Sequence, residues 1–430
     1  MLSAEVNRLL TQTGAGTPLG ELFRRYWLPA LRADELPVPD CAPVRVRLLG
    51  EDLVAFRDTA GRVGLLDEHC PHRRTSLFLG RNEDGGLRCV YHGWKFSVDG
   101  KCLDMPSEPA CSTFKDKVRA TSYPCVERGG VVWAYLGPAA SMPEPPSFEW
   151  TLVRASHRLT TRWLQGVNFL QALEGALDSS HLSFLHRGNF AADYVPDAKG
   201  PAYIAESTAP EFHLDDADHG LVVAAKRPLS DGTAYWRVTQ YVMPTFVLVP
   251  PNARNARNWL GFVPVDDATT CCWAVSWQPA QPMSAGERDR LKSGVGLHLA
   301  LIPGTLTPKA NRENGYLQNR ALQATGASFT GIPGVGAQDF AVVDSAGTVC
   351  DRTKERLGTS DRAIIAAREL LATSAHDVAR GRVPRGSQPG THLIRSASFV
   401  GPVEATHSDR EDLLAFDRDR DLAETGVSAP

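Results

Sequence analysis

The chain has 430 residues, more than one usual domain, so two domains with separate cores are expected. Its 43% hydrophobic and 22% charged residues are typical of a globular protein, and a formal net charge of −3 excludes the strongly basic composition of nucleic-acid-binding proteins. The sequence has no run of about 18 apolar residues and no recognisable signal peptide, so we expect no membrane association and a cytoplasmic location. Nine irregularly spaced Cys predict thiols and metal ligands rather than a disulfide framework.

The first third of the chain predicts a helical segment followed by strands. Thr17-Pro18 is a typical helix start, with the hydroxyl as N-cap and Pro at the first helical position, and the predicted helix runs through Tyr26-Trp27. Short aliphatic runs punctuated by Gly and Asp then predict an antiparallel meander or sandwich, with strands at 44–50, 52–58, 62–68 and 129–137.

Two mixed Cys and His pairs stand inside this β-rich region. They are Cys70-Pro-His72 and Cys89-Val-Tyr-His92. A zinc finger usually pairs Cys with Cys and His with His, whereas a Rieske [2Fe–2S] cluster takes one Cys and one His from each of two loops. We therefore predict a Rieske cluster, with a structural zinc site and four unrelated loop residues as the alternatives.

The remainder of the chain predicts a second, larger α+β domain. A Pro-rich stretch at 137–150 is the expected linker. Beyond it, β-branched and aromatic residues predict strands at 221–228, 235–251 and 271–277, and helical spacing predicts helices at 284–300 and 360–380. The last thirty residues, rich in Asp, Arg and Ser, are expected to be loosely docked or partly disordered.

A second group of possible ligands lies at the start of this domain, in the order Glu174, Asp178, His181 and His186. On a helix, Asp178 and His181 would be neighbours, so the carboxylate could orient the imidazole of a metal-bound His. His181 and His186 lie roughly 140° apart on an ideal helix, so the helix must end or distort between them if both bind one ion. Two His and one carboxylate are the ligands of non-haem Fe(II) oxygenases.

With both motifs, the chain resembles the oxygenase component of Rieske non-haem iron aromatic ring-hydroxylating oxygenases. Within that group it is similar to the phthalate dioxygenase family. The resemblance covers nearly the whole chain, on the stretches 16–31, 70–74, 89–96, 104–109, 168–186, 334–347 and 351–368. It implies an N-terminal β-sandwich Rieske domain and a catalytic domain with an antiparallel sheet flanked by helices. The expected division is 1–40 for an N-terminal helical segment, 41–145 for the Rieske domain, 151–400 for the catalytic domain and 401–430 for the tail.

The resemblance also implies the roles of the metal ligands. Cys70 and Cys89 would hold one iron of the cluster, and His72 and His92 the other. His181 and His186 would bind the mononuclear iron. The third ligand of the family, an Asp after a Gly-rich loop, matches Asp339, with Asp344 and Asp351 as nearby competitors and a helix N-cap as the alternative role of Asp339.

Electrons for such an enzyme come from NADH through a separate flavin and iron–sulfur reductase. The chain itself has no G-x-G-x-x-G unit between a strand and a helix, so we expect it to bind no dinucleotide. O2 would be the co-substrate. The family places the cluster of one subunit beside the mononuclear iron of the next in a trimer or a multiple of trimers, and Asp178 matches its bridging carboxylate, between His181 and His92 of the partner subunit.

The expected substrate is an aromatic carboxylate such as phthalate or a substituted benzoate, which would be converted to a cis-diol. Cations on predicted strands, Lys226, Arg227 and Arg237, could pair with the carboxylate, although each could equally lie on a solvated sheet face. An aryl-ether O-demethylase or monooxygenase on the same scaffold is the alternative, and a simple electron carrier is a third reading that would leave the second domain without a use.

Overall fold

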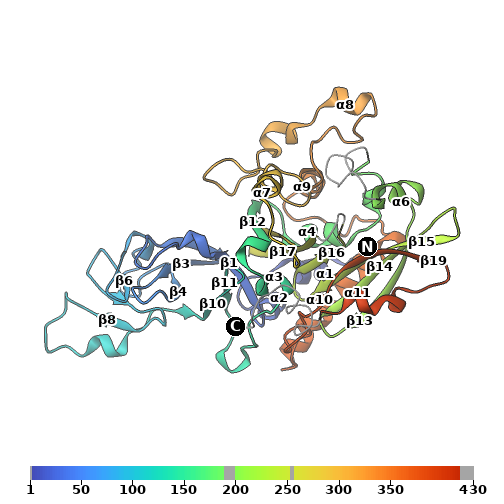
Figure 1. The fold of residues 1–430 in the computed structure, drawn as a ribbon. Coiled ribbons are helices and arrows are strands. Elements are labelled where there is room, and N and C mark those ends of the chain that lie inside the picture. Colours follow the sequence, from blue (N-terminus) through green and yellow to red (C-terminus); the bar gives the residue numbers. More distant parts are fainter. Residues whose placement is uncertain (1, 188–198, 252–255, 417–430) are drawn as a thin grey trace.

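A computed structural model describes residues 2–187, 199–251 and 256–416. The molecule is elongated, with small N-terminal sheets at one end and a larger body of long strands and helices at the other (Figure 1). The predicted α+β class, with a β-rich N-terminal part and a larger part that combines an antiparallel sheet with helices, is confirmed.

The N-terminal segment begins with two helices and then joins a sheet. Helix α1 (Ala4–Thr11) is capped by Ser3, and α2 (Pro18–Phe23) is capped by Thr17, as predicted. The expected extension of α2 to Trp27 is wrong. Trp27 instead begins β1 (Trp27–Arg32) and pairs with Tyr135 of β11 (Val131–Tyr135), because the strand buries its aromatic and aliphatic side chains against that neighbour.

Two small antiparallel sheets form the end of the molecule that carries the Cys and His pairs. The first contains β2 (Val44–Leu48), β3 (Glu51–Arg57), β4 (Val63–Asp67) and β9 (Ser122–Tyr123). The second contains β5 (Arg81–Glu83), β6 (Gly86–Arg88), β7 (Lys95–Phe96) and β8 (Cys102–Asp104). The predicted strands at 44–50, 52–58 and 62–68 are thus confirmed. A separate hydrophobic cluster fills the space between the sheets.

The predicted Pro-rich linker is packed rather than loose. Before it, β10 (Cys125–Arg128) pairs with β11. Phe148 and Trp150, at the end of the stretch, are buried and stack near Trp133, and Trp27 Nε1 donates to the carbonyl of Pro143 at 2.9 Å. These aromatic residues make one continuous core between the three-stranded sheet and the large body.

An eight-stranded antiparallel sheet is the centre of the large body. Its order is β12-β18-β17-β16-β15-β14-β13, with β19 also paired to β15. The strands are β12 (Arg158–Gln165), β13 (Glu211–Ala217), β14 (Gly220–Pro228), β15 (Thr233–Val242), β16 (Phe246–Val249), β17 (Arg257–Asp266), β18 (Thr269–Trp277) and β19 (Ala397–Pro402). The predicted strand at 235–251 is therefore two strands, and β12, β13, β17 and β19 were not predicted.

Helices lie around this sheet, and two of them lead to the functional site (Figure 1). The helices of this part of the chain are α3 (Glu149–Leu152), α4 (Phe169–Leu177), α6 (Gly200–Glu206), α7 (Ala285–Lys292), α8 (Arg320–Ala324), α9 (Val335–Ser345), α10 (Arg362–Ala379) and α11 (Glu411–Leu414). The two that lead to the site are α4 and α9. The prediction for α10 is confirmed. Helix α7 ends at Lys292 and not at Ala300, because Gly294 and Gly296 adopt positive φ.

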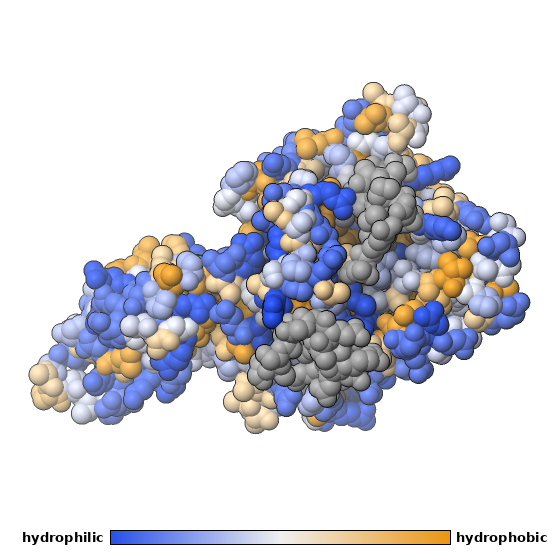
Figure 2. All heavy atoms as spheres, in the orientation of Figure 1, coloured by the Kyte–Doolittle hydropathy of each residue, from blue (hydrophilic) through white to orange (hydrophobic). Residues whose placement is uncertain are grey.

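The tail is docked as far as it is described. Strand β19 pairs with β15, and His407 contacts Asp215, so the expectation of a loose tail is wrong for 401–416, while 417–430 lies outside the described residues. Within the described ranges, no helix has the length and apolar character needed to cross a bilayer. On the face seen in Figure 2, hydrophobic residues occur in small separate groups among hydrophilic ones.

Candidate functional site

The two Cys and His pairs lie on loops with matching hydrogen bonds. Cys70 N–H donates to Thr75 O at 2.9 Å, and Cys89 N–H donates to Trp94 O at 2.8 Å. In each loop the Cys carbonyl accepts from the residue four positions later, which is Arg74 or Gly93, at 2.9 and 3.0 Å. Both of those residues have positive φ. The loops are therefore two copies of one tight turn that presents a Cys followed by a His.

The thiols and the imidazoles of these loops lie in different surroundings. Cys70 and Cys89 are buried in the small core, where burial raises the pKa of the Cys70 thiol to about 12. His72 is exposed, and its ring lies 4.4 Å from the ring of His92 and stacks on Trp94 at 4.3 Å. A buried thiol pair and an outer imidazole pair match the two unequal irons of a Rieske cluster.

The second group of ligands is built on the end of α4. The helix ends at Leu177, before Asp178, and not between His181 and His186 as expected. The reason is local, because Asp178 Oδ1 accepts from Ser180 N–H at 2.6 Å and so replaces the helical pattern with an Asx turn. A 3-10 turn over His181–Ser183 follows, and tight turns then bring His186 back toward His181.

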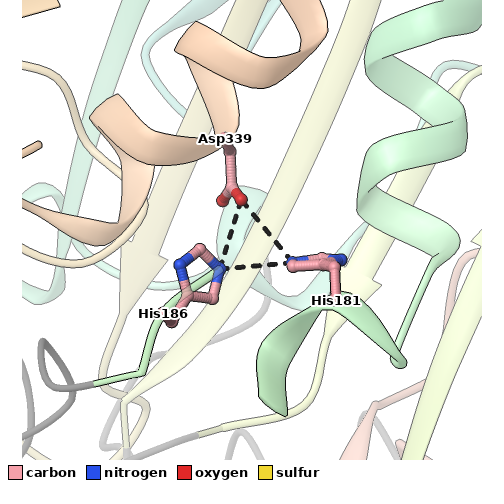
Figure 3. Close-up of side chains that lie close together, drawn as sticks. All are labelled: His181, His186 and Asp339. Atoms are coloured by element: carbon pink, nitrogen blue, oxygen red, sulfur yellow. Dashed lines mark hydrogen bonds and ion pairs between the residues drawn. The ribbon is translucent and has the colours of Figure 1, made fainter. Parts of the chain in front are cut away.

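Three donor atoms converge from this turn and from α9 (Figure 3). His181 Nε2 and His186 Nε2 lie 3.2 Å apart, and Asp339 Oδ1 lies 3.5 Å from the first and 3.2 Å from the second. Ligands about 2.1 Å from one ion, at roughly right angles, are about 3.0 Å apart, so the separations suit a single metal ion. Each of the three side chains can offer one donor atom to the same ion.

Asp178 lies against the first imidazole. Its Oδ2 is 3.6 Å from His181 Nδ1. Burial opposes ionisation of Asp178, but the contacts with His181 and the N–H of Ser180 outweigh it and hold the carboxyl pKa below its usual range. An ionised carboxylate therefore faces the ring nitrogen of His181 that does not face Asp339 and His186.

The competing carboxylates have other partners. Asp344 is buried and accepts from Arg312 Nη2 at 3.0 Å and from the Tyr316 hydroxyl at 2.5 Å. Asp351 is exposed and contacts Thr353 and Lys354. The N-cap of α9 is Gly334, so Asp339 lies inside the helix and has no capping role.

Glu174, grouped with the ligands in the sequence, belongs instead to a buried ion-pair network. Arg352 Nη2 lies 2.9 Å from Glu174 Oε2, and Arg368 Nε lies 2.7 Å from Oε1. Arg352 is fully buried, and Arg368 also pairs with Glu355. The network attaches α4 to α10 and fixes the helix that leads to Asp178.

Replacing Glu174 by Ala is expected to lower the free energy of unfolding by about 3 kcal/mol or more, because two buried guanidinium groups lose a charged acceptor. Chemical denaturation of the variant measures this. Glu313→Ala, at an exposed glutamate, is the matched control, and a loss no larger than in that control would contradict the role of the network.

An apolar cavity of about 100 Å³ adjoins the three donors. Aromatic and aliphatic side chains dominate the lining, with Gln165, Arg237 and Thr239 as polar groups from the sheet; the apolar members include Trp163, Val249, Leu260, Phe262, Leu297 and Phe340.

The three predicted substrate cations occupy different places. Arg237, on β15, is buried and lines the cavity. Arg227 is buried one strand away and donates to Ser179 O at 2.5 Å, against the turn that follows α4. Lys226 points to the other face of the sheet, where its ammonium lies 5.6 Å from the centre of the Trp236 ring, and it is absent from the cavity lining.

Two family models together match most of the chain. Residues 26–123 match the Rieske [2Fe-2S] domain, and residues 134–418 match the family described as LigXa C-terminal domain like. The chain belongs to the Rieske non-haem iron oxygenases. It is 41% identical, over 92% of its length and 94% of the relative, to the 3-chlorobenzoate-3,4-dioxygenase oxygenase subunit of Comamonas testosteroni. It is 40% identical, over 94% of its length and 93% of the relative, to the phthalate 4,5-dioxygenase oxygenase subunit of Pseudomonas putida.

The fold agrees with solved structures of Rieske oxygenases. Dicamba monooxygenase bound to dicamba superposes with a TM-score of 0.58 at 19% identity, over 84% of this chain and 99% of that one. The chain is therefore an oxidoreductase of the phthalate dioxygenase family that uses a Rieske cluster, a mononuclear iron and O2. Oxygenase components of Rieske dioxygenases work with a reductase or ferredoxin partner, and one of the similar solved structures, of carbazole 1,9a-dioxygenase, is an oxygenase and ferredoxin complex.

One residue of the site was missed by the sequence reasoning. Gln338 precedes Asp339, is fully buried and contacts His186 Nδ1 through Oε1 at 2.8 Å. Helical spacing assigns it to a different face from Asp339, and nothing local indicates that its side chain reaches a histidine 152 positions earlier.

Proposed function

We propose that the chain is the terminal oxygenase of a Rieske dioxygenase system and converts an aromatic carboxylate, such as a substituted benzoate or phthalate, to a cis-diol. The observation that carries this proposal is the position of Arg237, a buried guanidinium in the lining of the apolar cavity that His181, His186 and Asp339 also line. A guanidinium binds a carboxylate through two parallel hydrogen bonds, so it would orient the ring as well as hold it.

In this assignment Cys70 and Cys89 hold one iron of the cluster, and His72 and His92 hold the other. His181, His186 and Asp339 hold the mononuclear iron, and their separations of 3.2 to 3.5 Å support one shared ion. When bound, that iron supplies the activation of O2. The protein orients the ring through Arg237 and excludes water with the apolar side chains of the cavity.

The electron path is proposed to cross between subunits. The loop between β6 and β7 lies at the far end of the molecule from α4 and α9 (Figure 1), which favours a route to a neighbour over one within the chain. His72, Val90 and Tyr91 are exposed at that end. We propose a trimer, or a multiple of trimers, in which these residues of one subunit approach Asp178 of the next.

A groove beside α4 suits such a contact. It has a volume of about 1100 Å³ and is lined by Asp178, Ser180, His181 and Phe184, among others. Asp178 and His181 also line the inner cavity, so they form the wall between the groove and the proposed substrate site. An ionised Asp178 could accept from His181 on its own chain and from His92 of the partner subunit.

The activity test uses the purified chain, a flavin and iron–sulfur reductase, NADH, O2 and a panel of benzoates. The expected cis-diol contains two oxygen and two hydrogen atoms more than the substrate. Both added oxygens are expected to carry the label when the O2 is isotopically labelled. A product with one added oxygen, or an aryl ether that loses its methyl group, would assign the monooxygenase or O-demethylase alternative. Turnover of neutral arenes without turnover of any benzoate would contradict the carboxylate substrate.

We also propose that the reaction takes place in the cytoplasm.

Arg237→Gln is expected to raise the KM for a benzoate by about 10-fold to 100-fold, because a hydrogen bond to a charged group contributes about 1.5 to 3 kcal/mol. Steady-state kinetics with the preferred benzoate measures this effect. Lys226→Gln is the matched control, since it removes a cation from the adjacent strand outside the cavity lining. Equal effects of the two substitutions would contradict the assignment of Arg237.

A further inference from the structure

Gln338 connects His186 to the loop that precedes α9. Its Oε1 lies 2.8 Å from His186 Nδ1, and its Nε2 donates to Ile332 O at 2.9 Å and to Thr330 Oγ1 at 3.0 Å. Gln338 and His186 are both fully buried. The amide therefore has a hydrogen-bond partner at each end and no exchange with solvent.

The orientation of this amide follows from its backbone partner. A carbonyl oxygen can only accept, so the NH2 group of Gln338 must face Ile332 O, and Oε1 must face His186. Ile332 is itself held, because its N–H donates to Thr330 Oγ1 at 3.0 Å, and the preceding carbonyl, Gly331 O, accepts from Asn319 N–H at 2.7 Å. The hydrogen-bonded backbone around Ile332 therefore fixes the orientation of the Gln338 amide, with its oxygen toward His186.

We propose that Gln338 is a positioning residue that holds His186 in the neutral Nδ1–H tautomer. An acceptor at Nδ1 requires a proton there, which leaves the lone pair on Nε2, the atom 3.2 Å from both His181 Nε2 and Asp339 Oδ1. The inference rests on the proposed role of His186 as an iron ligand. One turn of α9 therefore carries both the ligand Asp339 and Gln338, which sets the tautomer of the ligand His186.

The two histidines differ in the acceptor that orients them. His181 faces the carboxylate of Asp178, and His186 faces the neutral amide of Gln338. The charges of Asp178 and Asp339 already balance those of Fe(II). A second orienting carboxylate, buried beside His186, would leave the site with excess negative charge, which burial opposes. A neutral acceptor at this position avoids that cost.

The test measures binding of Fe(II) to the mononuclear site by anaerobic equilibrium dialysis, on protein whose Rieske cluster is intact. Gln338→Met keeps the length and volume of the side chain but offers neither a strong acceptor nor a donor. Its dissociation constant for Fe(II) is expected to rise about 10-fold to 100-fold, while the Rieske absorption stays unchanged. Gln338→Glu is expected to restore binding, because a buried neutral carboxylic acid donates to Ile332 O and accepts from His186.

Gln171→Met is the matched control for destabilisation. Gln171 is also a buried glutamine bonded at both ends, with Nε2 donating to Gly347 O at 2.8 Å and Oε1 accepting from Cys350 N at 2.7 Å. Unchanged Fe(II) affinity in Gln338→Met, an equal loss in Gln171→Met, or no recovery in Gln338→Glu would overturn the inference. Retention of iron by His186→Ala would instead contradict the ligand set of the proposed function.

Discussion

Asp178→Asn is expected to leave both metal sites filled and the trimer intact, and yet to slow reoxidation of the reduced Rieske cluster by on the order of 100-fold. The reason lies in the turn after α4. The N–H of Ser180 needs the acceptor that Asp178 Oδ1 now provides at 2.6 Å, so the Asn oxygen would take that place. Its NH2 group would then face His181 Nδ1 and the groove, where it opposes imidazole N–H groups instead of accepting from them.

The measurement is stopped-flow oxidation of the reduced cluster by O2 with a benzoate bound, together with iron content and oligomer mass. Asp351→Asn is the control, because it changes an exposed carboxylate that contacts Thr353 and Lys354. A parental rate in Asp178→Asn, or full activity in an isolated monomer, would contradict the route between subunits. Loss of the trimer alone would show that Asp178 acts in assembly and not in electron transfer.

The sequence predicted the chemistry of the two sites better than the backbone that carries them. The spacing of Cys70 and His72, and of Cys89 and His92, predicts two loops because each pair is local, and the structure has two matching turns there. The convergence of Asp339 on His181 needs the whole fold, since no periodic pattern relates residues so far apart. That residue was selected over Asp344 and Asp351 through the resemblance, and the geometry favours the same choice.

The errors in the predicted elements have local causes. The end of α4 was placed too late, although the run Asp178-Ser179-Ser180 contains side chains that compete with the helix for backbone N–H groups. Strand β17 was missed because it contains Gly261 and Pro264, which are depleted in strands. In the structure, a side chain at Gly261 would meet the Trp259 ring at 2.6 Å, so packing requires the glycine that weakened the pattern.

The most complete loss of function is expected from a reciprocal pair of substitutions, His181→Ala and Cys89→Ser. His181→Ala removes one of three donors, so iron is expected to fall from about three to about two atoms per chain, with turnover abolished and the Rieske absorption and EPR signal retained. Cys89→Ser removes a buried thiolate, so the Rieske signal is expected to disappear while anaerobic Fe(II) still binds at the other site.

The two effects are expected to be independent because the sites belong to different parts of the fold. Cys89 lies in the small core between the N-terminal sheets. Among the residues that the structure describes, this core shares no buried residue with the core of the large body, and the two regions lie at opposite ends of the molecule (Figure 1). Iron analysis and EPR on both variants, with circular dichroism to confirm folding, measure this. Loss of the Rieske signal in folded His181→Ala protein would contradict two separate metal sites, whereas its retention without turnover would place the oxygen chemistry at His181, His186 and Asp339.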